Sequence, residues 1–127
     1  MQKDFDKWNE LKKDLNKNDS GFFFHEREVW WCSIGVNLGF EQDGRSDTFE
    51  RPVLIIKKFN QAIFLGLPMT SAQKSGKYYR KTQHEGREYT IVLSQIRLFD
   101  GKRLQRKIRI LPKKEFEDVI RYFKDIL

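Results

Sequence analysis

The sequence predicts a small, mainly antiparallel β-barrel or half-barrel of about five to seven strands, with one helix before it and one after it. Three observations lead to this prediction. Short runs rich in β-branched and aromatic residues recur along the middle of the chain, separated by turn residues. Apolar residues at helical spacing occur near the two ends. The length of 127 residues fits one domain with a single modest core.

The first predicted element is an amphipathic helix between Asp4 and Lys17. Residues 18–21, Asn-Asp-Ser-Gly, end it. We therefore predict a helical extension over residues 1–20 and the main domain over residues 21–127. An apolar stripe of this kind either covers the domain's own core, which is the commoner case, or docks on a partner. The stripe consists of Phe5, Trp8, Leu11 and Leu15.

Apolar runs with β-type composition predict the strands. A long polar loop, residues 39–51, separates the first strand from the second, and Phe59-Asn60-Gln61 forms a short turn that makes the second and third strands a hairpin. The segment from Thr90 to Leu98 is predicted as one further strand. The first three strands are predicted at Glu28–Ile34, Pro52–Lys58 and Ala62–Met69.

The last predicted element is a core-packing helix that Pro112 opens at its first helical position. Before it, Asp100-Gly101 makes a turn, and the run from Lys102 to Leu111 is strongly basic. Such a run is either a solvated face or part of a surface for a polyanion. The apolar stripe of the helix is Phe116, Val119, Ile120, Phe123 and Leu127.

Charge and composition limit the classes of partner and cellular location that the protein can have. The net charge of +7 and the pI near 9.6 favour a polyanionic partner such as nucleic acid. No apolar run is long enough to cross a bilayer, and the charged N-terminus does not fit a signal peptide, so we predict a cytoplasmic protein with no membrane association.

Cysteine and histidine give little support to metal chemistry. Cys32 lies in an apolar aromatic run, cannot form an internal disulfide, and is more typical of a small buried residue than of a nucleophile. His25 and His84 are far apart and show no ligand spacing. We therefore predict no metal site and no cofactor.

Several polar residues stand next to apolar strands, where functional sites are often built. Arg51 lies at the joint between the polar loop and a strand, although it and Glu41 could be ordinary solvated charges. Period-two geometry would put Gln95 and Arg97 on one face of the strand 90–98. They either satisfy neighbouring backbone groups or line a polar site.

The segment after the third strand is small, polar and basic. It contains Ser71, Lys74 and Lys77, and it leads into Tyr78 and Tyr79. Aromatic residues interleaved with cations are typical of single-stranded nucleic acid binding, in which rings stack on bases and cations contact phosphates. The alternative is that the paired tyrosines are half-buried strand residues.

Several short motifs, taken in order, resemble the MazF/PemK family of toxin endoribonucleases over roughly Glu28 to the C-terminus. The resemblance implies an SH3-like barrel that forms a homodimer. It also implies sequence-specific, metal-free cleavage of single-stranded RNA such as mRNA, as the toxin of a type II toxin–antitoxin system, and inhibition by a cognate antitoxin. The motifs are Glu28-Val29-Trp30-Trp31, Gly39-Phe40-Glu41-Gln42, Arg51-Pro52-Val53-Leu54-Ile55, Pro68-Met69-Thr70-Ser71, Ser94-Gln95-Ile96-Arg97 and Lys102-Arg103-Leu104.

The resemblance assigns catalytic positions residue by residue. The family's arginine before the Pro-Val-Leu strand falls on Arg51, its threonine after the third strand on Thr70, its strand glutamine on Gln95, and its loop acid on Glu41. The chain departs from the family pattern in three places: Phe40 stands where some members have histidine, Ser94 where many have an acid, and the loop 42–51 is longer than usual. We predict RNA contacts at Ser71, Lys74, Lys77, Tyr78 and Arg97.

The chemistry supports these residue types independently. When the 2′-hydroxyl attacks the neighbouring phosphate, the protein must help remove its proton, protonate the leaving oxygen and stabilise extra charge on the phosphate. Arginine suits that charge because its planar group binds two phosphate oxygens and stays protonated. Thr70 and Gln95 can donate hydrogen bonds. Glu41 is the best candidate for the general base, with His25 as an outsider.

Two other classes of function stay open at this point. A non-catalytic nucleic-acid-binding barrel would share the basic charge and the aromatic residues. A gyrase-poisoning toxin of the CcdB type would share the fold and act on a protein.

Overall fold

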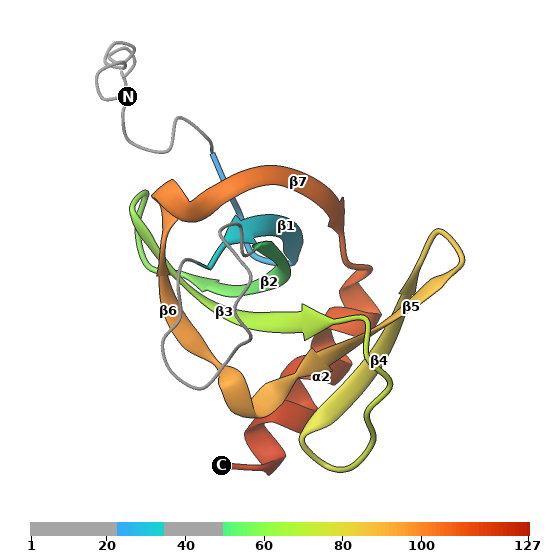
Figure 1. Ribbon diagram of the computed structural model, residues 1–127. Coiled ribbons are helices and arrows are strands. Elements are labelled where there is room, and N and C mark those ends of the chain that lie inside the picture. Colours follow the sequence, from blue (N-terminus) through green and yellow to red (C-terminus); the bar gives the residue numbers. More distant parts are fainter. Residues whose placement is uncertain (1–22, 35–49) are drawn as a thin grey trace, which may run out of the picture.

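The computed structural model describes residues 23–34 and 50–127, and within them the chain is mainly β, as predicted (Figure 1). The predicted C-terminal helix is present. The predicted N-terminal helix and most of the long loop lie outside the described residues. The elements are β1 Glu28–Ser33, β2 Glu50–Lys58, β3 Ile63–Thr70, β4 Tyr79–His84, β5 Arg87–Val92, η2 Leu93–Gln95, β6 Arg97–Asp100, η3 Gly101–Arg103, β7 Leu104–Ile110 and α2 Lys113–Asp125.

The described strands form one curled antiparallel sheet in the order β4-β5-β3-β2-β1-β7, with β6 paired to β3. The predicted hairpin of β2 and β3 is confirmed. Strand β3 has different neighbours along its length, because Gly66 pairs with β6 whereas Thr70 pairs with β5. This change of partner bends the sheet into the half-barrel that Figure 1 shows.

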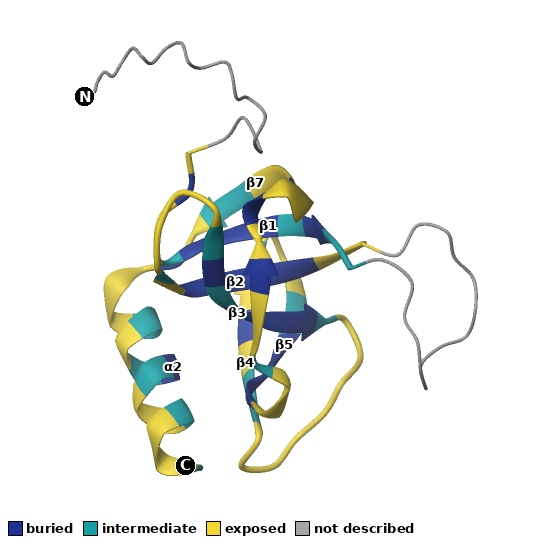
Figure 2. Ribbon diagram, turned by 90° about the vertical axis from the view of Figure 1, so that its left-hand side faces the viewer, coloured by how far each residue is buried: buried dark blue, intermediate teal, exposed yellow. Residues whose placement is uncertain are grey.

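The two faces of the sheet bury separate apolar clusters. Inside the curl, Gly66 allows close packing, since a Cβ there would lie 2.6 Å from Cγ1 of Val53. On the other face, α2 packs against the sheet through Val119 and its neighbours, with its exposed residues turned outward (Figure 2). The inner cluster comprises Phe24, Trp30, Cys32, Val53, Ile55, Phe64, Phe99 and Leu104.

The predicted strand from Thr90 to Leu98 is wrong. Strand β5 ends at Val92, the chain turns through η2, and β6 begins at Arg97. The buried Leu93 fixes this corner, where its backbone N–H donates to the carbonyl of Tyr78 at 2.8 Å. Gln95 and Arg97 are therefore not alternate residues of one strand, and the prediction that they share a strand face does not apply.

The sequence prediction also missed the start of β5 and the tight turn that joins it to β4. Glu85 and Gly86 have φ angles of 53° and 79°. A two-residue hairpin turn with both φ values positive matches the twist of the strands. Glycine is common at such positions and glutamate is not, so the sequence carried only half of the usual pattern.

Helix α2 differs from the prediction at both ends. It begins at Lys113, one residue later than predicted, and Pro112 is its N-cap instead of its first helical residue. Leu127 is 87% exposed and lies outside the packed stripe, where Ile126 takes part instead.

Polar contacts join α2 to the β4–β5 hairpin. Glu115 accepts a hydrogen bond from the hydroxyl of Thr82, and its Oε1 lies 3.5 Å from Nη2 of Arg109. The guanidinium of Arg80 lies 3.9 Å from the ring centre of Tyr122. These contacts assign the side chains of Arg80 and Thr82 to the helix side of β4.

Glu28 is a buried carboxylate, 4% exposed, at the start of β1. Its Oε1 accepts from the backbone N–H of His25 and from Nε1 of Trp30, each at 2.9 Å, and its Oε2 accepts from Nζ of Lys107 at 3.3 Å. Burial alone would raise the pKa of Glu28, but the hydrogen bonds and the Lys107 charge outweigh it, so the pKa is lowered. The ionised form therefore stabilises the fold.

We expect Glu28→Gln to lower the free energy of unfolding by about 1 to 3 kcal/mol near neutral pH. Because the folded-state pKa is depressed, this contribution is present above the ordinary value of 4.5 and is lost as the pH falls through the lower folded value. Urea unfolding near pH 7 and near pH 3 should thus show a difference from the parent that shrinks in acid. Glu117→Gln, on the exposed face of α2, is the matched control. An equal difference at both pH values would contradict this account of the carboxylate.

Candidate functional site

Arg51 is the second residue of β2 and is exposed at one end of the half-barrel. It is paired with Cys32 of β1. Paired residues on neighbouring strands place their side chains on the same face, and Cys32 and Val53 belong to the inner cluster. The side chain of Arg51 therefore emerges at the rim of the inner face.

Thr70 is the last residue of β3, the strand next to β2 in the sheet. The pairing of β2 with β3 includes Val53 with Pro68, and two more residues along each strand lead to Arg51 and Thr70. Neighbouring strands lie about 4.8 Å apart. Continued by two residues, this register brings positions 51 and 70 to neighbouring strand ends on one face.

The hydroxyl of Thr70 is oriented by its own loop. Its Oγ1 accepts a hydrogen bond from the backbone N–H of Ala72 at 3.2 Å. A hydroxyl has one hydrogen to donate besides the lone pairs with which it accepts. Thr70 can therefore donate its hydrogen to a ligand while the loop holds its oxygen.

Two further arginines lie near the same end of β1. Burial raises the pKa of Cys32 to about 12, against the influence of Arg103 and Arg97, whose charges lower it. Nη1 of Arg103 donates to the carbonyl of Ser33 at 3.5 Å. Arg97 pairs with Gly66, on the inner face, and lies over the ring of Phe99 at 4.9 Å.

We call Arg51, Arg97 and Arg103 the rim arginines. Within the described part of the chain, no carboxylate forms an ion pair with any of the three. An arginine group that is not neutralised by the protein is available to an anionic ligand. The sequence analysis did not select Arg103 as a site residue, although it stands in the Lys-Arg-Leu motif.

Gln95 lies on the surface as the last residue of η2. This short helix contacts β3 and β4 and leads directly into Arg97. Gln95 is thus close in the fold to the strand that carries Thr70, but the turn at η2 places it there and not the alternation of a strand. Its catalytic assignment stays a prediction.

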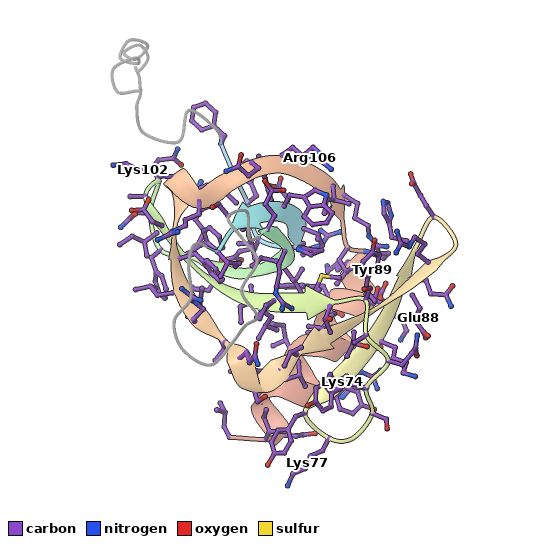
Figure 3. The ribbon with its side chains drawn as sticks, viewed as in Figure 1. Lys74, Lys77, Glu88, Tyr89, Lys102 and Arg106 are labelled. Atoms are coloured by element: carbon purple, nitrogen blue, oxygen red, sulfur yellow. The ribbon has the colours of Figure 1, made fainter. Side chains whose placement is uncertain are left out.

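The predicted RNA-binding residues of the loop between β3 and β4 are all exposed. Nζ of Lys77 lies 5.3 Å from the ring centre of Tyr78, which is 41% exposed, whereas Tyr79 is half-buried at the start of β4. Lys74 and Lys77 lie far from the basic residues of η3 and β7, marked by Lys102 and Arg106 (Figure 3). Basic charge is therefore spread over more than one part of the surface.

The candidate general bases are Glu41, Glu50 and His25, and the structure describes the positions of only the last two. Glu41 lies outside the described residues. Glu50 pairs with Ser33 beside Arg51, but strand alternation directs it to the other face. His25 lies just before the start of β1, at the opposite end from Cys32, with its Nδ1 3.4 Å from Oε2 of Glu28. The geometry does not favour His25.

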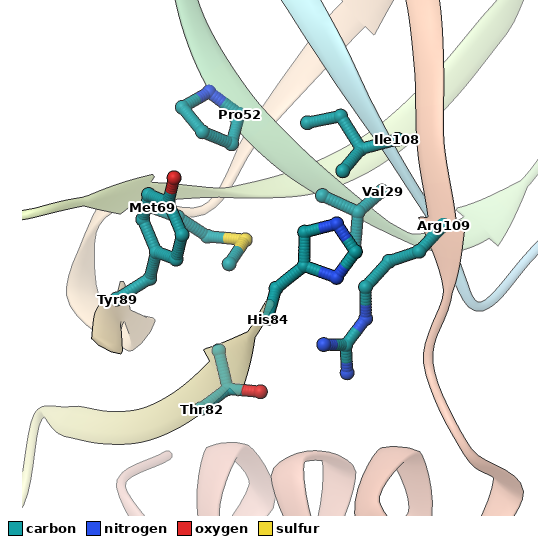
Figure 4. A pocket seen from close by; sticks show the side chains of 8 residues that line it. All are labelled: Val29, Pro52, Met69, Thr82, His84, Tyr89, Ile108 and Arg109. Carbon is teal, nitrogen blue, oxygen red and sulfur yellow. The ribbon is translucent and has the colours of Figure 1, made fainter. Parts of the chain in front are cut away.

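A small pocket lies on the helix side of the sheet, and Pro52 and Met69, the sequence neighbours of Arg51 and Thr70, help to line it. Its lining includes the polar side chains of His84, Arg109, Thr82 and Tyr89 (Figure 4). Its volume of about 20 Å³ is that of one or two water molecules, which is too small for a nucleotide. The residues around it are Val29, Pro52, Met69, Thr82, His84, Tyr89, Ile108 and Arg109.

Two further properties concern the residues that the structure describes. Among them, no three His, Cys, Asp or Glu side chains gather as metal ligands would. None of their helices is long and apolar enough to cross a membrane.

The fold and the rim arginines define the class: a small curled β-domain with cationic side chains at one open end. The chain belongs to the family of PemK-like, MazF-like toxins of type II toxin–antitoxin systems, whose family model matches residues 25–127. The resemblance inferred from the sequence motifs is thereby confirmed.

A solved structure supports the fold. The crystal structure of MazF (Form-I) from Deinococcus radiodurans is similar with a TM-score of 0.68 and 17% sequence identity, covering 83% of this chain and 96% of that one. Comparison with curated proteins gives no significant match. The protein is therefore a toxin of the type II class by family, with a MazF-like half-barrel.

Proposed function

We propose that this toxin is a metal-independent, sequence-specific endoribonuclease that cleaves single-stranded RNA such as mRNA through attack of the 2′-hydroxyl on the adjacent phosphate. The observation that carries the proposal is the pairing of β2 with β3, whose register, continued two residues beyond Val53 and Pro68, brings Arg51 and Thr70 to the same end and face of the sheet. The proposal builds on membership of the PemK-like, MazF-like toxin family and on the resemblance of the sequence motifs to its toxin endoribonucleases.

The two residues have complementary tasks. The guanidinium of Arg51 binds two non-bridging phosphate oxygens and stabilises the charge that grows as the 2′-oxygen attacks. The hydroxyl of Thr70 donates to the same phosphate, held by its contact with Ala72. Gln95 orients the ribose or a phosphate oxygen, and Arg97 and Arg103 contact neighbouring phosphates.

Proton transfer completes the proposal. Glu41, the loop acid that the resemblance assigns, takes the proton from the 2′-hydroxyl, and the departing 5′-oxygen takes a proton from water. The loop residues Ser71, Lys74, Lys77 and Tyr78 extend the RNA-binding surface from Thr70, with the exposed tyrosine stacking on a base.

We also propose a cytoplasmic homodimer that a cognate antitoxin holds inactive. The exposed Leu98 and Ile110, 55% and 52% accessible, provide apolar area for such contacts. An acidic, partly disordered antitoxin peptide suits the net charge of +7, because it would order on binding and cover the cationic rim.

Incubation of the purified protein with a mixed RNA should give discrete fragments, and excess EDTA should leave the rate unchanged. Attack by the 2′-hydroxyl expels a 5′-oxygen, so the fragments should end in a 2′,3′-cyclic phosphate or its 3′-phosphate hydrolysis product. Once a cleavage site is mapped, a 2′-deoxynucleotide on the 5′ side of the scissile phosphate should abolish cutting there.

Activity that EDTA stops and magnesium restores, or continued cleavage next to the deoxynucleotide, would contradict this mechanism. RNA bound without any fragments would favour the non-catalytic barrel. Intact RNA together with inhibition of purified gyrase would favour the gyrase poison.

A further inference from the structure

A row of polar side chains crosses four neighbouring strands at the end of the sheet that carries Arg51. Thr70 of β3 pairs with Thr90 of β5, and Thr90 pairs with Lys81 of β4. Side chains in register across adjacent strands share a face. Arg51, Thr70, Thr90 and Lys81 therefore lie on the same side of the sheet, with one cation at each end of the row.

The loop after Thr70 runs along this row and holds it together. Ala72 donates its N–H to Oγ1 of Thr70, and its carbonyl accepts from Oγ1 of Thr90 at 3.0 Å, which leaves Thr90 1% exposed. Nζ of Lys81 donates to Oε1 of Gln73 at 3.3 Å. The ammonium of Lys81 is thus held towards the loop that begins at Thr70.

The two residues next to Lys81 on β4 contact helix α2 and do not face the row. Arg80 and Thr82 contact α2 through Tyr122 and Glu115, on the opposite face. Lys81 itself is exposed, and no carboxylate in the described ranges forms an ion pair with it. Its ammonium has three hydrogens, of which Gln73 takes one, so two remain for a ligand.

We propose that Lys81 is a phosphate-binding residue that positions the RNA, and that it contacts a phosphate other than the one held by Arg51 and Thr70. Lys81 stands two strand spacings from Thr70, roughly 10 Å, too far to share that phosphate. The proposal rests on the proposed function, since it takes Thr70 as the reference point. It sets the direction in which the RNA leaves the site: across β5 and β4, alongside the loop.

The probe is a short single-stranded RNA that spans the mapped cleavage site and carries the blocking 2′-deoxynucleotide. Lys81→Ala should weaken its binding about five- to tenfold and reduce the slope of log affinity against log salt by about one. Single-turnover cleavage of the all-ribose RNA at saturating protein should keep the parental rate. Lys81→Arg should restore most of the affinity. Lys114→Ala, an exposed lysine on α2, is the control and should bind as the parent does.

A set of probes with one uncharged methylphosphonate linkage each locates the contact. In the parent, one linkage outside the scissile phosphate should weaken binding, and in Lys81→Ala that same linkage should have no further effect. Parental affinity of Lys81→Ala, an equal loss in Lys114→Ala, or an effect spread over all linkages would overturn the inference.

The binding measurements separate this inference from the proposed function. If the protein binds the RNA pool but cuts nothing, the endoribonuclease proposal fails, and the same linkage scan on a bound RNA still tests Lys81. If the protein cuts RNA and Lys81→Ala binds normally, the role of Lys81 alone is wrong.

Discussion

Arg51→Ala should slow RNA cleavage by about a hundredfold or more under single-turnover conditions, as deletion of one oxyanion donor does in other enzymes. The side chain makes a charge-assisted contact that strengthens as the phosphate gains charge, so the loss should fall mainly on the cleavage rate constant and less on RNA affinity. The exposed position at the rim predicts a melting temperature near that of the parent.

Two companion variants sharpen the test. Arg51→Lys keeps the charge without the planar group and should recover only part of the rate. Lys57→Ala removes an exposed cation from the same strand and should cleave normally. Parental cleavage by Arg51→Ala, or a loss of activity that comes only from unfolding, would return Arg51 to an ordinary surface charge.

Thr70→Val should reduce the cleavage rate by roughly tenfold to a hundredfold, because valine keeps the shape of threonine and lacks the hydroxyl that donates to the phosphate. The substitution also removes the acceptor of the Ala72 N–H, so the loop itself could shift. Thr70→Ser keeps the hydroxyl for both partners and should retain most of the activity in the same single-turnover assay. Equal loss in the serine and valine variants would indicate that the methyl group and packing matter, and not the hydrogen bond.

Much of the fold could be predicted from local pattern. The β2–β3 hairpin follows from two apolar runs around a three-residue turn, and α2 follows from apolar residues at steps of three and four. The corner at η2 could not be predicted in this way, because the apolar run through Leu93 and Ile96 looks continuous. The break arises because β5 pairs with the end of β3, whereas β6 pairs with the beginning of β3. This change of position is set by tertiary pairing and leaves no local sequence signal.

Some residues of the candidate site could be predicted from local sequence motifs, and others could be found only from the tertiary structure. Arg51 and Thr70 were selected from motifs, and the pairing of β2 with β3 explains why residues so distant in sequence lie at the same end of the sheet. Arg103 and Lys81 were missed because the chain has many basic residues, and composition does not distinguish those that lie near the site from the rest. Cross-strand pairing makes that distinction for Lys81, and the hydrogen bond to the carbonyl of Ser33 makes it for Arg103.

The burial of Cys32 has a practical consequence for all of these measurements. Its thiol is shielded from solvent, and burial raises its pKa to about 12, so it is scarcely ionised near neutral pH. A thiol-specific dye can therefore label the protein only in molecules whose strands have separated. Because Cys32 stands opposite Arg51 in the sheet, the sole cysteine of the chain is a built-in reporter of local opening beneath the rim, and dye uptake distinguishes a variant with altered chemistry from one with a loosened barrel.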